Sequence, residues 1–188
     1  MSSALEEVIG SSLSSQVGLL TNAAFTLVMV LAALLDFHSR RIPNYLTITA
    51  VVVGILLRAP YGLQSVGLGV LGIGLALVLT IPLFFLGVLG GGDVKLLGVV
   101  GAFMGPGQLI GACLLIALLG GVFALADAAL KGTLGAVFRN LLHVIISWFS
   151  RGETTVVTLT SPSAMTIPYG VPIAVGALAW WYGGGNLA

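Results

Sequence analysis

The segment VGLGVLGIGLALVLTIPLFFLGVL, residues 66–89, contains 24 residues and no charged side chain. A continuous apolar run of this length can cross the hydrocarbon core of a bilayer, which is about 30 Å thick, as one α-helix. The bilayer offers no hydrogen-bond partners to the backbone, so the segment must form its hydrogen bonds internally, as a helix does. Residues 66–89 are therefore predicted to be a membrane-spanning helix.

The composition of the whole chain is typical of a membrane protein. Of its 188 residues, 58% are hydrophobic and 7% are charged, against about 25% charged residues in an ordinary soluble domain. So few charges cannot cover a globule with hydrated side chains, and the abundance of apolar residues excludes a disordered chain. The net charge of +1 offers no field for nucleic acid, so no DNA or RNA partner is expected. The single cysteine, Cys113, lies in an apolar run and is interpreted as a packing residue.

Glycine, proline and charged residues divide the rest of the chain into further apolar segments. Together with residues 66–89, the predicted spans are 17–35, 45–57, 94–104, 108–130 and 167–182. Two of them hold only about 13 and 11 residues, so they must extend further, thin the bilayer or lie inside the bundle beside water. Gly105-Pro106-Gly107 predicts a turn, with Pro106 starting the next helix. The fold class is thus an all-α, polytopic membrane helical bundle with about six transmembrane helices.

A different pattern follows the fifth predicted span. In residues 134–149, Arg139, His143 and Ser147 recur at every fourth position among apolar side chains, which predicts one interfacial helix along the membrane surface. We interpret His143 as part of this polar face rather than as a ligand or base. Residues 154–166 are rich in hydroxyl-bearing and β-branched side chains and predict an irregular or extended loop.

The distribution of basic residues orients the bundle, because Lys and Arg near span ends favour the cytoplasm. With the N-terminus outside, Arg58 alone lies outside, and six basic residues lie inside: Arg40, Arg41, Lys95, Lys131, Arg139 and Arg151. No basic region precedes the first apolar segment, which we interpret as a retained span rather than a signal peptide. Residues 1–188 are then one membrane-embedded domain, in which residues 131–166 form the cytoplasmic interfacial helix and loop.

Three acidic side chains fall within or against the predicted spans. A charged side chain costs about 3 kcal/mol at the centre of a membrane helix, so each of the three needs a boundary position or a function. Asp36 ends the first span and Asp93 begins the fourth, and the predicted topology brings both to the cytoplasmic edge. Asp127 lies near the same side but lacks a comparable sequence setting.

The sequence around both aspartates is unusual. Gly90-Gly91-Gly92 removes three side chains directly before Asp93, which gives a partner close access to the carboxylate. The start of a helix also favours the anionic form of Asp93. After Asp36, Pro43 stops the helix and Asn44 is suited to cap the next one. The alternative interpretation makes Asp93 an N-cap and Asp36 a residue that reaches the surface at a helix end.

Two carboxylates held side by side cannot both ionise comfortably, so they share a proton. One can then activate a water molecule while the other protonates a carbonyl oxygen, as in aspartic proteases. Such a pair can hydrolyse a peptide bond without a metal, and no cofactor is expected. A metal site has little support, because His38 and His143 are far apart in the sequence and no Cys/His cluster is present.

Two other classes of protein remain open at this point. A small ion- or proton-coupled transporter or channel would also use short, glycine-interrupted helices and intramembrane carboxylates, although we find no inverted repeat and no charge at the membrane midplane. A structural assembly subunit would need neither carboxylate. The protease interpretation predicts instead that Asp36 and Asp93 are both essential.

Three motifs resemble those of the type IV prepilin peptidases. Gly90-Gly91-Gly92-Asp93-Val94-Lys95 is similar to their second active-site motif, and the stretch from Asp36 through Ile42-Pro43-Asn44 is similar to their first. Ile167-Pro168-Tyr169-Gly170 resembles the segment that opens their last span. This resemblance, which covers nearly the whole chain, implies a GxGD-type aspartic endopeptidase of the inner membrane with Asp36 and Asp93 as its catalytic pair. The implied substrates are prepilins or pseudopilins, whose class III signal peptides are cut after a glycine on the cytoplasmic side.

Residues near the pair are candidates for supporting the site or binding substrate: Gly90, Gly91, Gly92, Lys95, Pro43, Asn44 and Tyr169. The ammonium of Lys95 could hold the charge of the pair or a substrate carboxylate, or it could simply extend to the membrane surface. Larger members of the family carry a cytoplasmic region with paired cysteines that methylates the new N-terminus. This sequence has no such cysteines, which implies the short, peptidase-only branch serving tight-adherence (Flp-type) pili. His38 stands where relatives often have Arg, and the archaeal preflagellin peptidases are similar as well.

Overall fold

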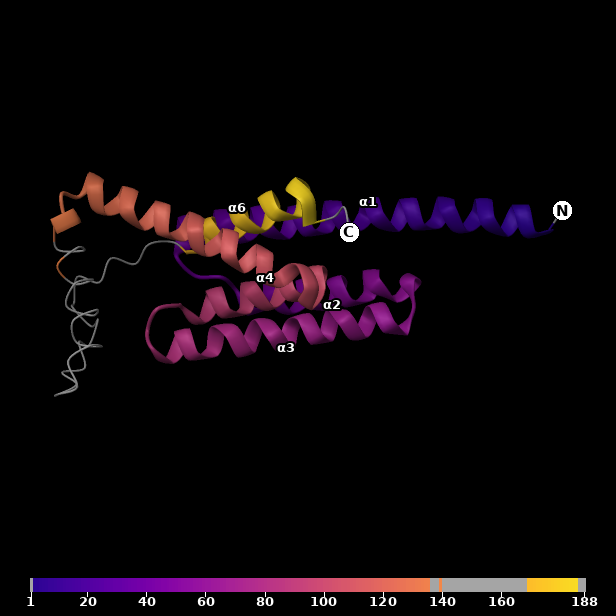
Figure 1. Ribbon diagram of the computed structural model, residues 1–188, viewed down its shortest axis with the longest axis horizontal. Helices are drawn as coiled ribbons and strands as arrows, with labels where there is room; N and C mark the ends of the chain where they lie inside the picture. Colours follow the sequence, from indigo (N-terminus) through magenta and orange to yellow (C-terminus); the bar gives the residue numbers. More distant parts are fainter. Residues whose placement is uncertain (1, 136–138, 140–168, 186–188) are drawn as a thin grey trace. The chain divides into compact units, whose positions relative to one another are not determined.

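The computed structural model describes residues 2–135, 139 and 169–185, and within them all regular structure is helical (Figure 1). The elements in chain order are α1 (Ser2–Ser39), α2 (Asn44–Arg58), η1 (Ala59–Tyr61), α3 (Leu63–Phe85), α4 (Gly91–Leu130), α6 (Gly170–Trp180) and η2 (Trp181–Gly185). Apart from residues 134, 135 and 139, the predicted interfacial helix lies outside the described residues, and so does the predicted loop 154–166.

In the described part of the chain, four helices are long and apolar enough to cross a membrane: Ser12–Ser39, Asn44–Tyr61, Leu63–Phe85 and Gly91–Leu130. This confirms the predicted helical membrane bundle for the part of the chain that the structure describes. The predicted boundaries are less accurate. The second span reaches 18 residues because η1 extends α2, which is enough for about 27 Å of helical rise. The third span begins and ends earlier than predicted, and α6 has only 11 residues.

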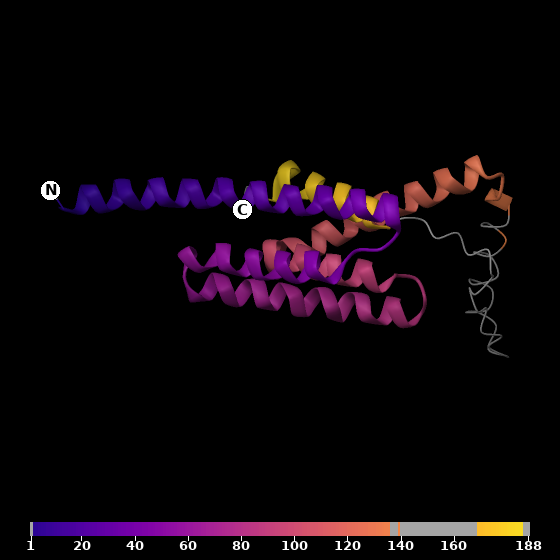
Figure 2. The ribbon, with the colours of Figure 1, turned by 180° about the vertical axis from the view of Figure 1, so that it is seen from behind.

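Helix α4 joins the predicted fourth and fifth spans across an interruption at Gly105. The backbone there has φ 73° and ψ 175°. The ribbon of α4 bends sharply within its length (Figures 1 and 2). Glycine adopts a positive φ without steric cost, and Pro106, which has no N–H, cannot continue the hydrogen-bond pattern of the preceding turn. The predicted turn is therefore present, but a single non-helical residue suffices for it.

Arg58 satisfies the carbonyl groups that this interruption leaves without helical partners. In a continuous helix the carbonyl of Ala102 would accept from residue 106 and that of Phe103 from residue 107. Instead, Nε of Arg58 donates to the Ala102 carbonyl at 2.9 Å and Nη2 donates to the Phe103 carbonyl at 2.6 Å. The side chain thereby acts as a C-terminal cap for the first half of α4.

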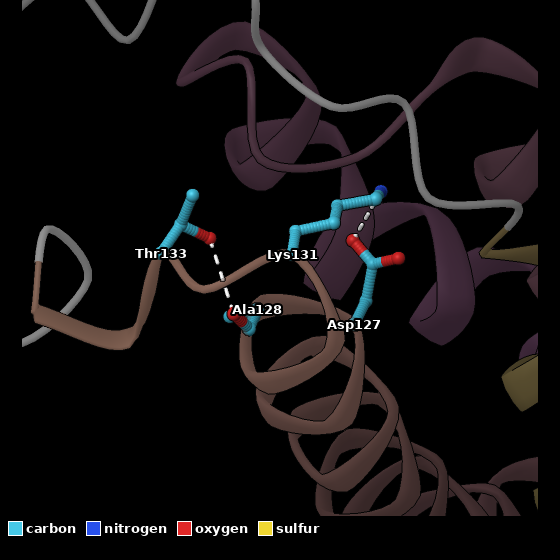
Figure 3. Close-up of polar contacts among 4 residues, drawn as sticks. All are labelled: Asp127, Ala128, Lys131 and Thr133. Carbon is cyan, nitrogen blue, oxygen red and sulfur yellow. Dashed lines mark hydrogen bonds and ion pairs between the residues drawn. The ribbon is translucent and has the colours of Figure 1, made fainter.

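The chain divides into two compact units, one formed by residues 1–117 with 168–188 and the other by residues 118–167. In the second unit the described part of α4 ends regularly. Lys131 and Asp127 form an ion pair at 2.6 Å, and the Thr133 hydroxyl donates to the Ala128 carbonyl at 3.3 Å (Figure 3). Gly132, with φ 66°, provides the left-handed residue that terminates the helix. Asp127 thus has a local partner one helical turn away.

The first unit has a core of aromatic and aliphatic side chains from α1, α4 and α6 with η2. Phe25 of α1 lies between Phe103 of α4 and Trp181 of η2, with ring centroids 5.2 Å and 4.8 Å from that of Phe25. Phe25 is fully buried. These contacts fix the helices in the half of the unit remote from the helix ends that carry Asp36 and Asp93.

Helices α3 and α4 contact each other backbone to backbone at Gly72 and Gly101. A Cβ atom added to either glycine would collide with the carbonyl oxygen of the other. Small residues permit such close approach of membrane helices, and the contact compensates for the weak hydrophobic driving force between helices in lipid. The glycines of the segment at residues 66–89 therefore include one that determines how α3 packs.

Replacing Gly72 or Gly101 by Ala is expected to destabilise the protein, because the added methyl group must separate two backbones. Overpacking of this kind costs about 1–3 kcal/mol, which corresponds to a fall of about 2–10 °C in the unfolding midpoint. Thermal unfolding in detergent measures it. Gly74→Ala is the matched control, since a Cβ at Gly74 meets no atom within 4 Å. Equal midpoints for all three variants would show that the glycine contact is absent.

Candidate active site

Asp36 lies in the last turn of α1, where the helix reaches the turn that leads to α2. Its side chain is buried, with 7% of the residue exposed, and its Oδ2 atom accepts a hydrogen bond from the backbone N–H of Gly170 at 2.7 Å. Gly170 is the first residue of α6. The N–H groups at a helix start have no partners within the helix, and the positive end of the helix dipole lies there. The start of α6 therefore stabilises the carboxylate of Asp36 directly.

This contact requires glycine at position 170. A Cβ atom at Gly170 would lie 2.7 Å from Oδ2 and 2.8 Å from Cβ of Asp36, so any side chain would displace one of the two residues. The prediction from the sequence includes the preceding residue, Tyr169, as a candidate site residue but does not include Gly170. The Ile-Pro-Tyr-Gly motif could have identified Gly170, because its glycine stands at the start of an apolar helix.

Asp93 lies in the first turn of α4, two residues after the helix begins at Gly91. Its side chain is buried, and its Oδ2 atom accepts a hydrogen bond from the backbone N–H of Gly90 at 3.0 Å. The interpretation of Asp93 as an N-cap is wrong, because the helix starts earlier than predicted. The carboxylate instead folds back onto the residue that precedes the helix, as the acidic member of a capping box does.

The triple glycine before Asp93 accommodates this arrangement. A Cβ atom at Gly90 would lie 3.1 Å from Oδ2 of Asp93, and one at Gly92 would lie 3.4 Å from Cβ of Ile42. Gly91 faces the ring of Phe84 at an ordinary contact distance of 3.6 Å. The glycines at 90 and 92 thus permit the return of the carboxylate and the close passage of the turn between α1 and α2.

The structure brings the two aspartates together. Asp36 ends α1, Asp93 begins α4 and Gly170 begins α6, all within the first unit. The carboxyl groups of Asp36 and Asp93 interact electrostatically across their separation in sequence, and Arg40 acts on Asp36 as a nearby positive charge. Two buried carboxyl groups, each fixed by one backbone N–H, therefore share one end of the helical unit.

Lys95 and Asn44 form a second polar contact beside this pair. The Lys95 ammonium donates to the side-chain oxygen of Asn44 at 2.7 Å, and both residues are exposed. Asn44 is the first residue of α2 rather than its cap, a position that Pro43 occupies in extended conformation. The expectation that Asn44 caps α2 is therefore wrong, because its side chain is used by Lys95. Among the described residues, no ion pair links Lys95 to either carboxylate.

Tyr169 precedes α6 and is partly buried, and its carbonyl oxygen accepts from the N–H of Ile173 at 3.1 Å. It therefore contributes a backbone contact to the helix start that holds Asp36.

Within the described ranges, no group of three or more His, Cys, Asp or Glu side chains is arranged to hold a metal ion. The chemistry on offer at this site is that of two carboxyl groups and the backbone N–H groups of Gly90 and Gly170.

Comparison with known protein families shows which family the chain belongs to. The family model described as type IV leader peptidase matches residues 23–125, which is more than half of the chain. The chain belongs to the type IV leader peptidase family. This leader peptidase is therefore a membrane-bound hydrolase, and the predicted resemblance to the prepilin peptidases is confirmed. No curated protein and no solved structure matches the chain.

The matched region of the leader peptidase contains Asp36, Asp93, Lys95 and Asn44, whereas Gly170 lies beyond it. The hydrogen bond from Gly170 is thus a feature that only the three-dimensional structure connects with the matched region. It shows how the last helix of the first unit contributes to a site whose acidic residues lie in the first and fourth helices.

Gly170→Ala is expected to lower the peptidase activity about 100-fold, because displacement of a reacting group by about 1 Å has an effect of this size. Cleavage of a prepilin-like substrate in detergent or vesicles measures the loss. Gly67→Ala serves as the control, since a Cβ there meets no atom within 4 Å. Full activity of Gly170→Ala, in membrane protein present at the normal level, would exclude the proposed contact with Asp36.

Proposed function

We propose that this leader peptidase is an aspartic endopeptidase in which Asp36 and Asp93 activate water to cleave the leader peptides of prepilins or pseudopilins. One observation carries the proposal. Two buried carboxyl groups that are distant in sequence interact at one end of the helical unit, and each is held by the N–H of a glycine at a helix start. A structural role would not require two buried acids that act on each other electrostatically, since like charges there are costly.

The geometry suits acid and base catalysis by the pair. One aspartate, ionised, accepts a proton from water while the water oxygen bonds to the carbonyl carbon of the scissile peptide. The other, protonated, gives its proton to the carbonyl oxygen. In the second step the carbon–nitrogen bond breaks, the nitrogen takes the proton from the first aspartate, and one hydroxyl returns a proton to the second. Both carboxyl groups then have their initial protonation states, so the cycle needs no metal or other cofactor.

Each Oδ2 atom is engaged by a backbone N–H, and among the described residues no hydrogen bond to either Oδ1 atom is present. The Oδ1 atoms are therefore the ones we assign to water and to the substrate carbonyl. The fixed N–H groups orient the carboxylates before substrate arrives, which lowers the cost of reaching the reactive geometry.

The basic residues support a cytoplasmic location for this end of the bundle. Arg40 and Arg41 follow Asp36, and Lys95 follows Asp93, which is the distribution expected at the cytoplasmic face of an inner-membrane protein with its N-terminus outside. A substrate would place its leader in the cytoplasm and its apolar segment against the bundle.

Asp36→Asn and Asp93→Asn are each expected to reduce cleavage by about 10³-fold or more, and the double variant is expected to be no worse than either single one, because the residues act as a unit. Co-expression with a candidate prepilin and measurement of its mobility shift tests this. Asn preserves the size of each side chain, so the variants should still insert into the membrane.

Asp127→Asn is the matched control. Asp127, in the last turn of α4, is paired with Lys131 just after that helix and lies in the second unit, so its replacement should leave cleavage near the level of the unaltered protein. Processing that persists in Asp36→Asn or Asp93→Asn would refute the aspartic mechanism. It would favour a scaffold or transporter role for the two carboxylates.

A further inference from the structure

At the end of the first unit remote from the aspartates, a cavity of about 430 Å³ opens between α1, the turn from α2 to α3, α4 and η2. Its polar lining consists of Thr21, Asn22, Arg58, Tyr61, Ser65 and Gln108. Asn22 and Asp36 lie 14 residues apart on α1, a rise of about 21 Å. The cavity is therefore separate from the candidate active site and lies toward the opposite membrane face.

The position of the cavity indicates the level of the lipid headgroups. Arg58, Tyr61 and Ser65 flank Gly62, where the chain turns between two helices that can each cross the membrane. A turn between consecutive spans lies at the surface of the bilayer, because its backbone groups need polar partners. Tyr61 is 51% exposed, as is typical of aromatic residues at the membrane interface.

The cavity is positively charged. Its one charged lining residue is Arg58, whose side chain is partly buried. Asp36, Asp93 and Asp127, the acidic residues whose side chains the structure describes, do not line it. The carbonyl groups that Arg58 caps offer only the partial negative charge of a helix end. A partly desolvated guanidinium is stabilised further by a full negative charge, such as that of a phosphate.

One N–H group of Arg58 and the side-chain oxygen of Gln108 indicate the chemistry of the occupant. The Arg58 guanidinium has five N–H donors, and its hydrogen bonds go to the Ala102, Phe103 and Ser65 carbonyls and the Ser65 hydroxyl, which leaves one N–H for a ligand. The side-chain oxygen of Gln108 is buried and has no hydrogen-bond partner among the described residues. An occupant that combines an acceptor with a hydroxyl donor would satisfy both groups.

We propose that this cavity binds the headgroup of an anionic glycerophospholipid, with the phosphate at Arg58 and a headgroup hydroxyl donating to the oxygen of Gln108. The volume lies within the roughly 300–1,000 Å³ of small-molecule sites. Leu57, Phe103 and Met104 line the same cavity and provide apolar contact for the glycerol and the first acyl carbons. A bound lipid would brace the turn at Gly105, since Arg58 caps the helix segment that ends there.

Thermal unfolding of the purified protein in detergent tests the proposal with three probes. Phosphatidylglycerol at about 100 times its dissociation constant should raise the unfolding midpoint by about 5 °C. Diacylglycerol with the same acyl chains lacks the phosphate and should raise it little. Inorganic phosphate should also have little effect; equal protection by inorganic phosphate would overturn the lipid assignment in favour of a free-anion site.

Two variants and a control locate the effect. Gly18→Leu places a side chain into the cavity from a helical position at which a Cβ meets no atom within 4 Å, so the variant should fold and lose the response to phosphatidylglycerol. Arg58→Gln removes the charge but keeps an amide donor for a carbonyl, and it should lose the response as well. Gly74→Leu, on α3 and outside the cavity lining, should keep it. An undiminished response in both Gly18→Leu and Arg58→Gln would overturn the proposal.

Discussion

A carboxylate that is removed from water must be given hydrogen-bond donors, and the arrangement of this protein follows from how it supplies them. Asp36 and Asp93 are both buried, and each accepts from the N–H of a glycine at the start of a helix. Helix starts offer unpaired N–H groups and the positive end of the helix dipole, and both favour a carboxylate. This arrangement restricts the residue type at two positions. Glycine must occupy positions 90 and 170, because a Cβ atom at either one would crowd a carboxylate.

This requirement links the elements of the first unit. The end of α1 must meet the start of α6, and the start of α4 must lie beside them, so three helices that are distant in sequence converge at one end. At the other end, the interruption at Gly105 lets α4 bend, and Arg58 satisfies the carbonyl groups exposed by the break.

Much of the architecture could be predicted from the sequence, because membrane spans depend on local hydropathy. Residues 66–89 and the positions of the six predicted spans follow from apolar runs, and Asp36 and Asp93 stand out because acids are rare in such runs. Helix ends were less predictable. Ser2–Ser39 extends well beyond the apolar segment, because a helix that has started can continue through polar residues. The span that begins with α2 is lengthened by the single turn η1.

The partners of individual side chains depend on tertiary contacts and could not be predicted. Gly170 donates to Asp36 across 134 positions in sequence, and Lys95 donates to Asn44 across 51. Asn is a residue type typical of N-caps, yet Asn44 is the first residue of α2 and its side chain accepts from Lys95 on a neighbouring helix. The sequence predicts only that Arg58 is an isolated charge outside the membrane. Its role as a cap depends on the tertiary structure, which brings the carbonyl groups of Ala102 and Phe103 beside it.

The most direct test of the account is a distance measurement between positions 36 and 93 in the membrane. In a Cys113→Ser background, Asp36→Cys combined with Asp93→Cys should form an intramolecular cross-link with a short bifunctional thiol reagent, detected by mass spectrometry of the linked peptides. Phe37→Cys combined with Asp93→Cys is the control, because Phe37 is 74% exposed whereas its neighbour Asp36 is buried. The account predicts efficient linkage of the first pair and little of the second. Single adducts alone at positions 36 and 93 would contradict it.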